Sequence, residues 1–247
     1  MEQLIYTLLA YINNSLEKDI NYSIALSLLE QSDKIEGFSL ETAAEACNVA
    51  PSTINRFCKR IGFKNFSHLR NSVGTFSNER NDEFLNNDRF EEQLKENVEM
   101  IENIKLEQME RIVTTIHKSR KIVLLGFEKN QVQAMELQKK LFHLGKFCEC
   151  STNLFKQVDA LSLLTEKDMI ITISIQGNIL MKDFSIIDKI KASKGKKLLI
   201  TFSDDFHQTE VFDEVLQCGK IENSVVSTYT LLRLFDVLVH RYQKQYP

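Results

Sequence analysis

The spacing of the hydrophobic residues changes once along the chain, and that change constrains the fold more than any other feature. Between residues 3 and 31, leucine and isoleucine recur at helical spacing, beginning with Leu4, Leu8 and Ile12. After residue 120, short strand-like runs alternate with amphipathic stretches; these runs are KIVLLG, KFCEC, DMIITIS, KKLLIT and FDEVLQCG. The sequence therefore predicts an all-α N-terminal domain followed by an α/β domain with a five-stranded parallel sheet.

A polar segment separates these two regions. Residues 77–89, SNERNDEFLNNDR, are rich in asparagine and charged residues, which is typical of a linker. A long helix is expected over about 90–118, and a closing helix follows the last strand. We therefore expect an N-terminal domain over residues 1–77, a linker and leading helix over 78–104, and a second domain over 105–247.

The net charge of −3 hides an uneven distribution. Residues 1–46 carry two bases and eight acids, whereas residues 47–80 carry six bases and one acid. A polyanionic partner would meet this basic segment locally, although a solvated basic helix would have the same charge. The motif within the segment must decide between the two interpretations. The six bases are Arg56, Lys59, Arg60, Lys64, Arg70 and Arg80.

Composition argues against a membrane, secreted or metal-binding protein. No apolar run approaches the ~20 residues of a membrane span, and the start lacks the basic flank of a secretory signal. The five cysteines are scattered and the five histidines stand singly, so we expect free thiols, no metal and no other cofactor. The expected location is the cytoplasm.

Residues 39–63 have the pattern of two helices joined by a tight turn. Ser39 is placed to cap the short helix LETAAEAC, and a second helix is expected from Pro51 to about Ile61, ended by Gly62. This is the arrangement that places a second helix in the major groove of DNA. The residues of that helix expected to face inward are Ile54, Phe57, Cys58 and Ile61.

The opposite side of the second helix carries side chains suited to DNA. Arginine can bridge guanine O6 and N7, asparagine can pair with adenine, and lysine and serine can hold phosphate oxygens. Lys59, Arg60 and Lys64 suit phosphate better than bases, and Arg70 suits either the DNA backbone or an ion pair. The candidate DNA-binding residues are Ser52, Thr53, Asn55, Arg56, Lys59, Arg60 and Lys64.

The run from Thr42 to Arg70, TAAEACNVAPSTINRFCKRIGFKNFSHLR, resembles the helix-turn-helix of the RpiR/MurR family of bacterial regulators. The residues in register with the family pattern are Thr53, Ile54, Arg56, Phe57, Gly62, Phe63 and Phe66. Ala50 departs from it where a capping serine is usual, at a cost of ~1 kcal/mol that Ser52 would partly offset. Asn65 stands where glycine is usual.

From about residue 105 onward, the chain resembles the SIS domain, the sugar-isomerase-type fold that follows the helix-turn-helix in these regulators. The resemblance implies dimerisation and a phosphosugar site in loops at the carboxyl ends of strands. The loops depart from the family pattern, because Glu128, Asp204 and Asp205 add negative charge and hydroxyls are missing after Ser174. The candidate effector-binding residues are Lys129, Asn130, Ser174, Gln176, Gly177, Asn178, Thr201 and Ser203.

The resemblance implies a regulator of carbohydrate-related genes that binds a double-stranded DNA operator as a homodimer or higher homo-oligomer. Two interpretations of the second domain remain open: an altered site for a sugar-phosphate-like effector, or a degenerate domain that only oligomerises. A phosphosugar isomerase is a third hypothesis, for which Glu128 or His207 would be the base. We expect that the protein is not an enzyme.

Overall fold

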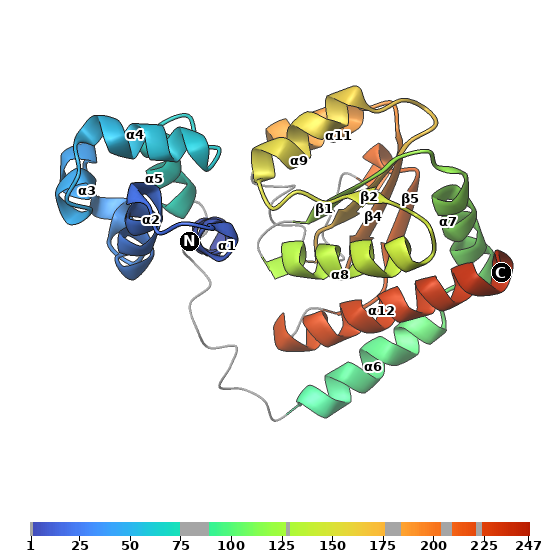
Figure 1. Cartoon of the computed structure of the whole chain (residues 1–247). Coiled ribbons are helices and arrows are strands. Elements are labelled where there is room, and N and C mark those ends of the chain that lie inside the picture. The colour runs from blue at the N-terminus through green and yellow to red at the C-terminus, as the bar shows by residue number, and fades with distance from the viewer. Residues whose placement is uncertain (1, 75–88, 127–128, 176–183, 204–208, 221–223) are drawn as a thin grey trace. The chain divides into compact units, whose positions relative to one another are not determined.

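The computed structural model describes residues 2–74, 89–126, 129–175, 184–203, 209–220 and 224–247 (Figure 1). The chain forms two compact units, one containing Met1–Arg80 and the other containing Asn81–Ser151 and Gln157–Pro247. The linker predicted over residues 77–89 lies, except for Arg89, outside the described residues. None of the described helices is long and apolar enough to cross a membrane.

The first unit is helical, as predicted. Its elements are α1 (Glu2–Asn14), α2 (Ile20–Glu30), the 3₁₀ turn η1 (Ile35–Gly37), α3 (Leu40–Ala46), α4 (Pro51–Arg60) and α5 (Phe66–Gly74). Asp19 caps α2 by accepting hydrogen bonds from the backbone N–H groups of Asn21 and Tyr22. A single core joins these helices, with its largest buried side chains including Leu8, Leu28, Ile54, Phe57 and Phe66.

The turn between α3 and α4 depends on one residue in the left-handed conformation. Asn48 has φ = 52°, which asparagine tolerates better than most residues other than glycine. Its N–H donates to the carbonyl of Glu45, and the N–H of Val49 donates to Ala44, both at 2.9 Å. These two bonds form a Schellman motif, which ends α3 and directs the chain into α4.

The second unit begins with two helices where the sequence predicted one. The predicted helix over 90–118 is α6 (Phe90–Glu102) followed by α7 (Leu106–Lys118). Asn103 ends α6, and Lys105 is extended with ψ = 130° before α7 begins. The break is explained by burial, because Ile101 packs in the core and Ile104 packs against it while the chain changes direction.

The remaining elements build a parallel sheet covered on both faces. They are β1 (Ile122–Gly126), α8 (Lys129–His143), β2 (Cys148–Glu149), α9 (Leu154–Ala160), η3 (Leu161–Leu163), β3 (Met169–Ile173), α11 (Phe184–Ala192), β4 (Lys196–Thr201), η4 (Thr209–Val211), β5 (Glu214–Gln217) and α12 (Ser224–Gln245). The strand order is β2-β1-β3-β4-β5, and all pairs are parallel. Helices α8 and α12 lie on one face, and α9 and α11 on the other (Figure 1). The predicted fold class is confirmed.

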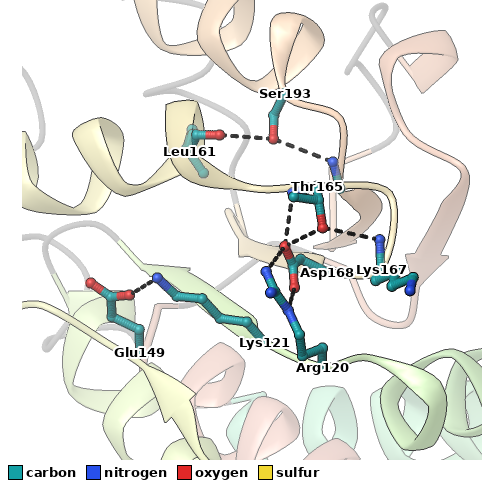
Figure 2. A network of polar contacts seen from close by, with 9 residues as sticks. Arg120, Lys121, Glu149, Leu161, Thr165, Lys167, Asp168 and Ser193 are labelled. Carbon is teal, nitrogen blue, oxygen red and sulfur yellow. Dashed lines mark hydrogen bonds and ion pairs between the residues drawn. The ribbon is translucent and has the colours of Figure 1, made fainter.

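A buried carboxylate connects strands at the side of the sheet where the strands begin, called here the amino edge (Figure 2). Asp168 is fully buried and accepts two hydrogen bonds from the Arg120 guanidinium, at 3.1 and 3.0 Å, and two from Thr165, both at 2.8 Å. These donors hold the pKa of Asp168 well below its usual range, with the Arg120 bond as the largest cause. The network joins the beginnings of β1 and β3 through side chains.

The five cysteines are free thiols, as expected, and four of them are buried. Burial raises the pKa of Cys47 and Cys150 to about 11, and that of Cys58 and Cys148 to about 12. Cys218 shifts in the same direction for the same reason. All five thiols are therefore protonated at neutral pH.

Candidate nucleic-acid interface and ligand site

Helix α4 separates its side chains as the sequence predicted. Ile54, Phe57 and Cys58 are fully buried, and the Phe57 ring packs edge-on against Tyr11 with ring centroids 5.4 Å apart. Ser52 and Lys59 are exposed on the other side, and the helix contains no acidic residue. Helix α4 therefore presents an exposed side with basic and no acidic side chains, anchored by a buried apolar side, as in helices that dock into a major groove.

Arg56 lies along the exposed surface of α4. Its Nη2 donates to the hydroxyl of Thr53 at 3.1 Å, one helical turn earlier. This single bond to a neutral partner leaves the guanidinium in solvent with its charge uncompensated by an ion pair of the described residues. The bond to Thr53 thus fixes one end of the guanidinium and leaves most of its five donors available to a ligand.

Arg60 is directed toward the rest of its own domain. Its Nη1 lies 3.4 Å from the hydroxyl of Tyr11 and 3.9 Å from the carboxylate of Asp19. The hydrogen bond to Tyr11, together with the nearby Asp19, raises the pKa of Arg60. The positive charge of Arg60 therefore interacts with Asp19 and Tyr11 of its own domain, between α1 and α2.

Asn55 is half-buried and has a bonding role inside the domain. Its Oδ1 accepts a hydrogen bond of 3.0 Å from the backbone N–H of Phe66, the first residue of α5. A bidentate contact to adenine needs this same oxygen. Sequence reasoning did not find this tie, because Asn55 and Phe66 are eleven residues apart and no pattern links them.

The residues after α4 complete the surface. Lys64 is exposed between α4 and α5, and Asn65 caps α5 by accepting from the N–H of His68 at 2.9 Å. The capping role explains why asparagine is suitable where the family usually has glycine. Arg70 donates to the backbone carbonyl of Phe38 at 3.2 Å, and Ala50 makes no side-chain cap on α4.

Four of the predicted effector residues lie at the side of the sheet where the strands end, called here the carboxyl edge. Asn130 follows β1, Ser174 follows β3, and Thr201 and Ser203 lie at the end of β4. The Thr201 hydroxyl donates to the carbonyl of Ile175 and accepts from the N–H of Ser203, both at 3.2 Å. Gln176, Gly177, Asn178 and the side chain of Lys129 lie outside the described residues.

A buried glutamine that sequence reasoning missed binds the last residue of β1. Gln157, on α9, accepts from the N–H of Gly126 at 3.1 Å and donates to the carbonyls of Gly126 and Ser151 at 3.0 and 2.7 Å. Gly126 is also crowded, because a Cβ there would lie 2.5 Å from the carbonyl oxygen of Asn130. The Gly126 N–H is therefore occupied and does not serve an anion.

Two amide oxygens near the end of β1 have no hydrogen-bond partner among the described residues. They are Oδ1 of Asn130 and Oε1 of Gln133, which belong to residues one turn apart on α8. Gln133 is only 7% exposed, and its Nε2 donates to the Thr228 hydroxyl at 3.1 Å. An unpaired buried acceptor costs about 1–3 kcal/mol, so these two oxygens are free to accept hydrogen bonds from a donor that the described residues do not supply. The described residues contain no cluster of ligands for a metal ion.

Comparisons with known proteins agree with this architecture. Residues 6–77 match the family model described as "Helix-turn-helix domain, rpiR family". An uncharacterized HTH-type transcriptional regulator of Haemophilus influenzae is 28% identical over 226 residues, covering 83% of this chain and 78% of that protein.

Two solved structures share the fold at low sequence identity. The Vibrio vulnificus NanR protein, complexed with ManNAc-6P, has a TM-score of 0.54 at 17% identity and covers 99% of this chain and 92% of its own. The sugar isomerase domain of an RpiR transcription factor from Sphaerobacter thermophilus has a TM-score of 0.51 at 17% identity, over 66% of this chain and 90% of that one. The chain therefore has an N-terminal helix-turn-helix domain of the RpiR family over residues 6–77, followed by an α/β domain with the fold of these solved structures, which is the arrangement of a DNA-binding transcriptional regulator.

Proposed function

We propose that this regulator binds a double-stranded DNA operator through the outward side of α4, and that Arg56 and Lys59 contribute most of the side-chain affinity. The observation that carries the proposal is the exposed, acid-free surface of α4 above a fully buried apolar side. Arg56 is suited to a guanine edge, while Lys59, Lys64 and Ser52 are suited to phosphates. Thr53 positions Arg56, and Asn55 and Arg60 support the domain.

The decisive test is an electrophoretic mobility shift assay with the upstream region of the protein's own operon. Each lost contact is expected to cost about 1–3 kcal/mol, so Arg56→Ala with Lys59→Ala weakens binding by about 100-fold or more. The slope of log K against log salt falls by about 2. Unchanged affinity in this double variant contradicts the assignment of α4.

A matched control removes the same charge elsewhere in the domain. Lys18 and Lys34 are exposed lysines outside α4, in the segment where acids outnumber bases. Lys18→Ala with Lys34→Ala is expected to change DNA affinity by less than about threefold, since only long-range electrostatics are altered. An equal loss in both double variants would indicate non-specific attraction rather than docking of α4.

We further propose that a sugar-phosphate-like effector binds at the carboxyl edge of the sheet and controls carbohydrate-related genes. The unpartnered oxygens of Asn130 and Gln133 support a ligand whose hydroxyl groups donate hydrogen bonds. NanR of Vibrio vulnificus provides a precedent, since its solved complex holds ManNAc-6P. Effector binding would shift the population of conformations that fit the operator.

A thermal-shift screen with a panel of sugar phosphates tests this effector site. A ligand at 100 times its dissociation constant stabilises the folded protein by about 2.7 kcal/mol, which raises the melting temperature measurably. If no compound at millimolar concentration raises it, the alternative of a domain that only oligomerises is favoured. An active compound must also change DNA affinity.

We propose a regulatory rather than enzymatic role, exercised in the cytoplasm by a homodimer. The Haemophilus influenzae relative is named as a transcriptional regulator, although one solved structure of similar fold, from Listeria monocytogenes, is described as a "putative sugar-phosphate isomerase". An isomerase needs a base beside the sugar, and the two candidates, Glu128 and His207, lie outside the described residues. Absence of turnover on the same sugar-phosphate panel is the expected result, and turnover would overturn the regulatory role.

A further inference from the structure

A cavity of the second unit lies near the amino edge of the sheet, away from the proposed effector site. It has a volume of about 520 Å³ and lies between η3 and the end of α11. Leu161, Thr165 and Ser193 belong to its lining and lie beside the Asp168 network in Figure 2. Strand β3 has five residues and spans about 16 Å, so the cavity and the carboxyl edge are at opposite ends of the sheet. The volume of the cavity is within the range of small-molecule sites, which is about 300–1,000 Å³.

The walls of this cavity offer mainly apolar surface. Val158, Leu161 and Leu164 line it and are buried in the second unit. Leu163 also lines it but is 74% exposed, which is unusual for a large apolar side chain next to a hollow. An apolar ligand that covered Leu163 would remove this surface from water, which is favourable.

The hydroxyl groups in the walls already donate hydrogen bonds within the protein. Ser193 donates to the carbonyl of Leu161 at 3.0 Å, and Ser162 donates to the carbonyl of Asp159 at 2.8 Å. Thr165 donates to the carboxylate of Asp168 at 2.8 Å. A polyhydroxylated ligand such as a sugar needs several free polar partners, so these walls favour a ligand with an apolar body.

Positive charge surrounds the cavity. Residues 189–197, KIKASKGKK, contain five lysines and no acid. Lys189 and Lys194 line the cavity, together with the acidic Asp159. The ion pair between Lys189 and Asp159 is long, at 3.9 Å, and both side chains are more than half exposed, so the pair is weak. The lining therefore attracts an anion.

Stabilisation of α11 explains only part of this charge. Lys189 and Lys191 lie in the last turn of α11, where a cation interacts favourably with the helix dipole. Lys194 lies beyond the end of the helix, is exposed, and forms no ion pair with any residue that the structure describes. The ammonium group of Lys194 is thus available to an anionic ligand.

We propose that this cavity binds a small amphipathic anion. Its apolar chain packs against Leu161, Leu163 and Leu164, and its carboxylate is bound by Lys194 with Lys189 nearby. This ligand differs in chemical class from a sugar phosphate, and its site is at the other end of the strands. The inference therefore does not rest on the proposed function and gives the second unit an additional ligand to which it can respond.

Octanoate is a suitable probe, because it carries a single carboxylate on a straight apolar chain. A ligand of this size is expected to bind with a Kd of about 1 mM. Methyl NMR titration of the full-length protein measures the Kd and the position, and the largest shifts are expected at Leu161, Leu163 and Leu164. Octanol has the same chain without the charge and should bind at least about tenfold more weakly. Equal affinity for octanoate and octanol overturns the proposal.

Two lysine variants form a matched pair. Lys194→Ala is expected to weaken octanoate binding about tenfold and to leave octanol binding unchanged, because only the charged contact is lost. Lys191→Ala removes the same charge from the same segment, but Lys191 does not line the cavity, so the Kd should change by less than about twofold. Equal losses in the two variants indicate non-specific attraction and overturn the site.

A third variant blocks the cavity itself. Ala192 lines the cavity at the exposed end of α11, so Ala192→Phe fills part of the space without disturbing the buried core. Binding of octanoate and of octanol should both be lost, while the melting temperature stays close to that of the wild type. Octanoate binding that survives Ala192→Phe overturns the assignment of this cavity.

The same titrations distinguish this site from the other possible occupants. Octanoate that shifts resonances only at the carboxyl edge overturns the proposal. An acidic peptide containing leucine that binds here when octanoate does not would indicate a protein-docking surface and also overturns it. A sugar phosphate bound at the carboxyl edge should not compete with octanoate, so failure of either site leaves the other standing.

Discussion

Where the strands of the sheet begin, the buried carboxylate of Asp168 accepts four hydrogen bonds, whereas near the ends of the strands the amide oxygens of Asn130 and Gln133 accept none from the part of the chain that the structure describes. Both edges belong to the same five strands and both bury polar atoms. The comparison separates two roles of buried polar groups, according to whether they have hydrogen-bond partners. Satisfied groups stabilise the fold, and unsatisfied groups lower its stability but can bind a ligand.

The largest expected effect is at the amino edge. In Asp168→Asn, an NH₂ group replaces one acceptor among four donors, so the unfolding free energy should fall by about 3 kcal/mol. Chemical denaturation measures the change. The control is Glu149→Gln, which removes a half-exposed ion pair with Lys121 that is visible in Figure 2 and should cost less than about 1 kcal/mol. Equal losses in the two variants would contradict a special role of the buried network.

The same residue predicts the acid sensitivity of the fold. The pKa of Asp168 is lowered in the folded protein, mainly by the bond from Arg120. Its stabilising contribution is therefore fully present above the ~3.9 of an unfolded aspartate and is lost as the pH falls below that value. Stability measured from pH 7 to pH 3 should fall more steeply in the wild type than in Asp168→Asn.

Gln157→Leu tests whether part of the carboxyl edge is structural. The leucine removes one accepted and two donated hydrogen bonds and leaves the backbone N–H of Gly126 buried without that partner, for an expected loss of about 2–3 kcal/mol. Gln138→Leu is the control, since that amide makes one bond, to the carbonyl of Cys148, and should cost about 1 kcal/mol. If the two variants lose the same unfolding free energy, the bonds of Gln157 to Gly126 have no special role in stability.

Thr201→Val removes a buried hydroxyl but preserves the shape of the side chain. The N–H of Ser203 and the carbonyl of Ile175 each lose a partner, so thermal denaturation should report a loss of about 1 kcal/mol. A loss of the effector response without a loss of stability would instead place this hydroxyl in the ligand site.

The smallest effect on stability is expected at Asn130. Asn130→Ala removes an oxygen that no described residue pairs, and it also removes side-chain packing, so the two effects should offset each other and change the unfolding free energy by no more than about 0.5 kcal/mol. The variant should nevertheless lose the thermal shift produced by any effector found for the wild type. A loss of 2 kcal/mol, or an unchanged thermal shift, would remove the contrast between the two edges.

The sequence was informative where function depends on a regular repeat. The spacing of Ile54, Phe57 and Cys58 predicted which side of α4 is buried, because helix geometry alone determines that side. The alternating strands and helices likewise predicted the parallel sheet. The seven candidate DNA-binding residues followed from the same geometry, and their contacts with DNA remain predictions.

The contacts that join distant segments could not be predicted from local patterns. The bonds from Asn55 to Phe66, from Arg60 to Tyr11 and from Gln157 to Gly126 connect residues eleven to forty-nine positions apart. No local pattern tells a solvated arginine from one paired with a distant tyrosine. The sequence also could not predict which amide oxygens lack a partner among the described residues, because Asn130 and Gln133 occur in a stretch of α8 with several other amides.

The buried thiols allow the transient opening of each unit to be measured separately. Cys47 and Cys58 belong to the core of the first unit, and Cys148 and Cys218 belong to that of the second. Since burial keeps these groups protonated and out of reach, an alkylating reagent can label them only when the surrounding helices part. Peptide-resolved labelling of the unaltered protein would thus give two independent opening free energies, with and without operator DNA.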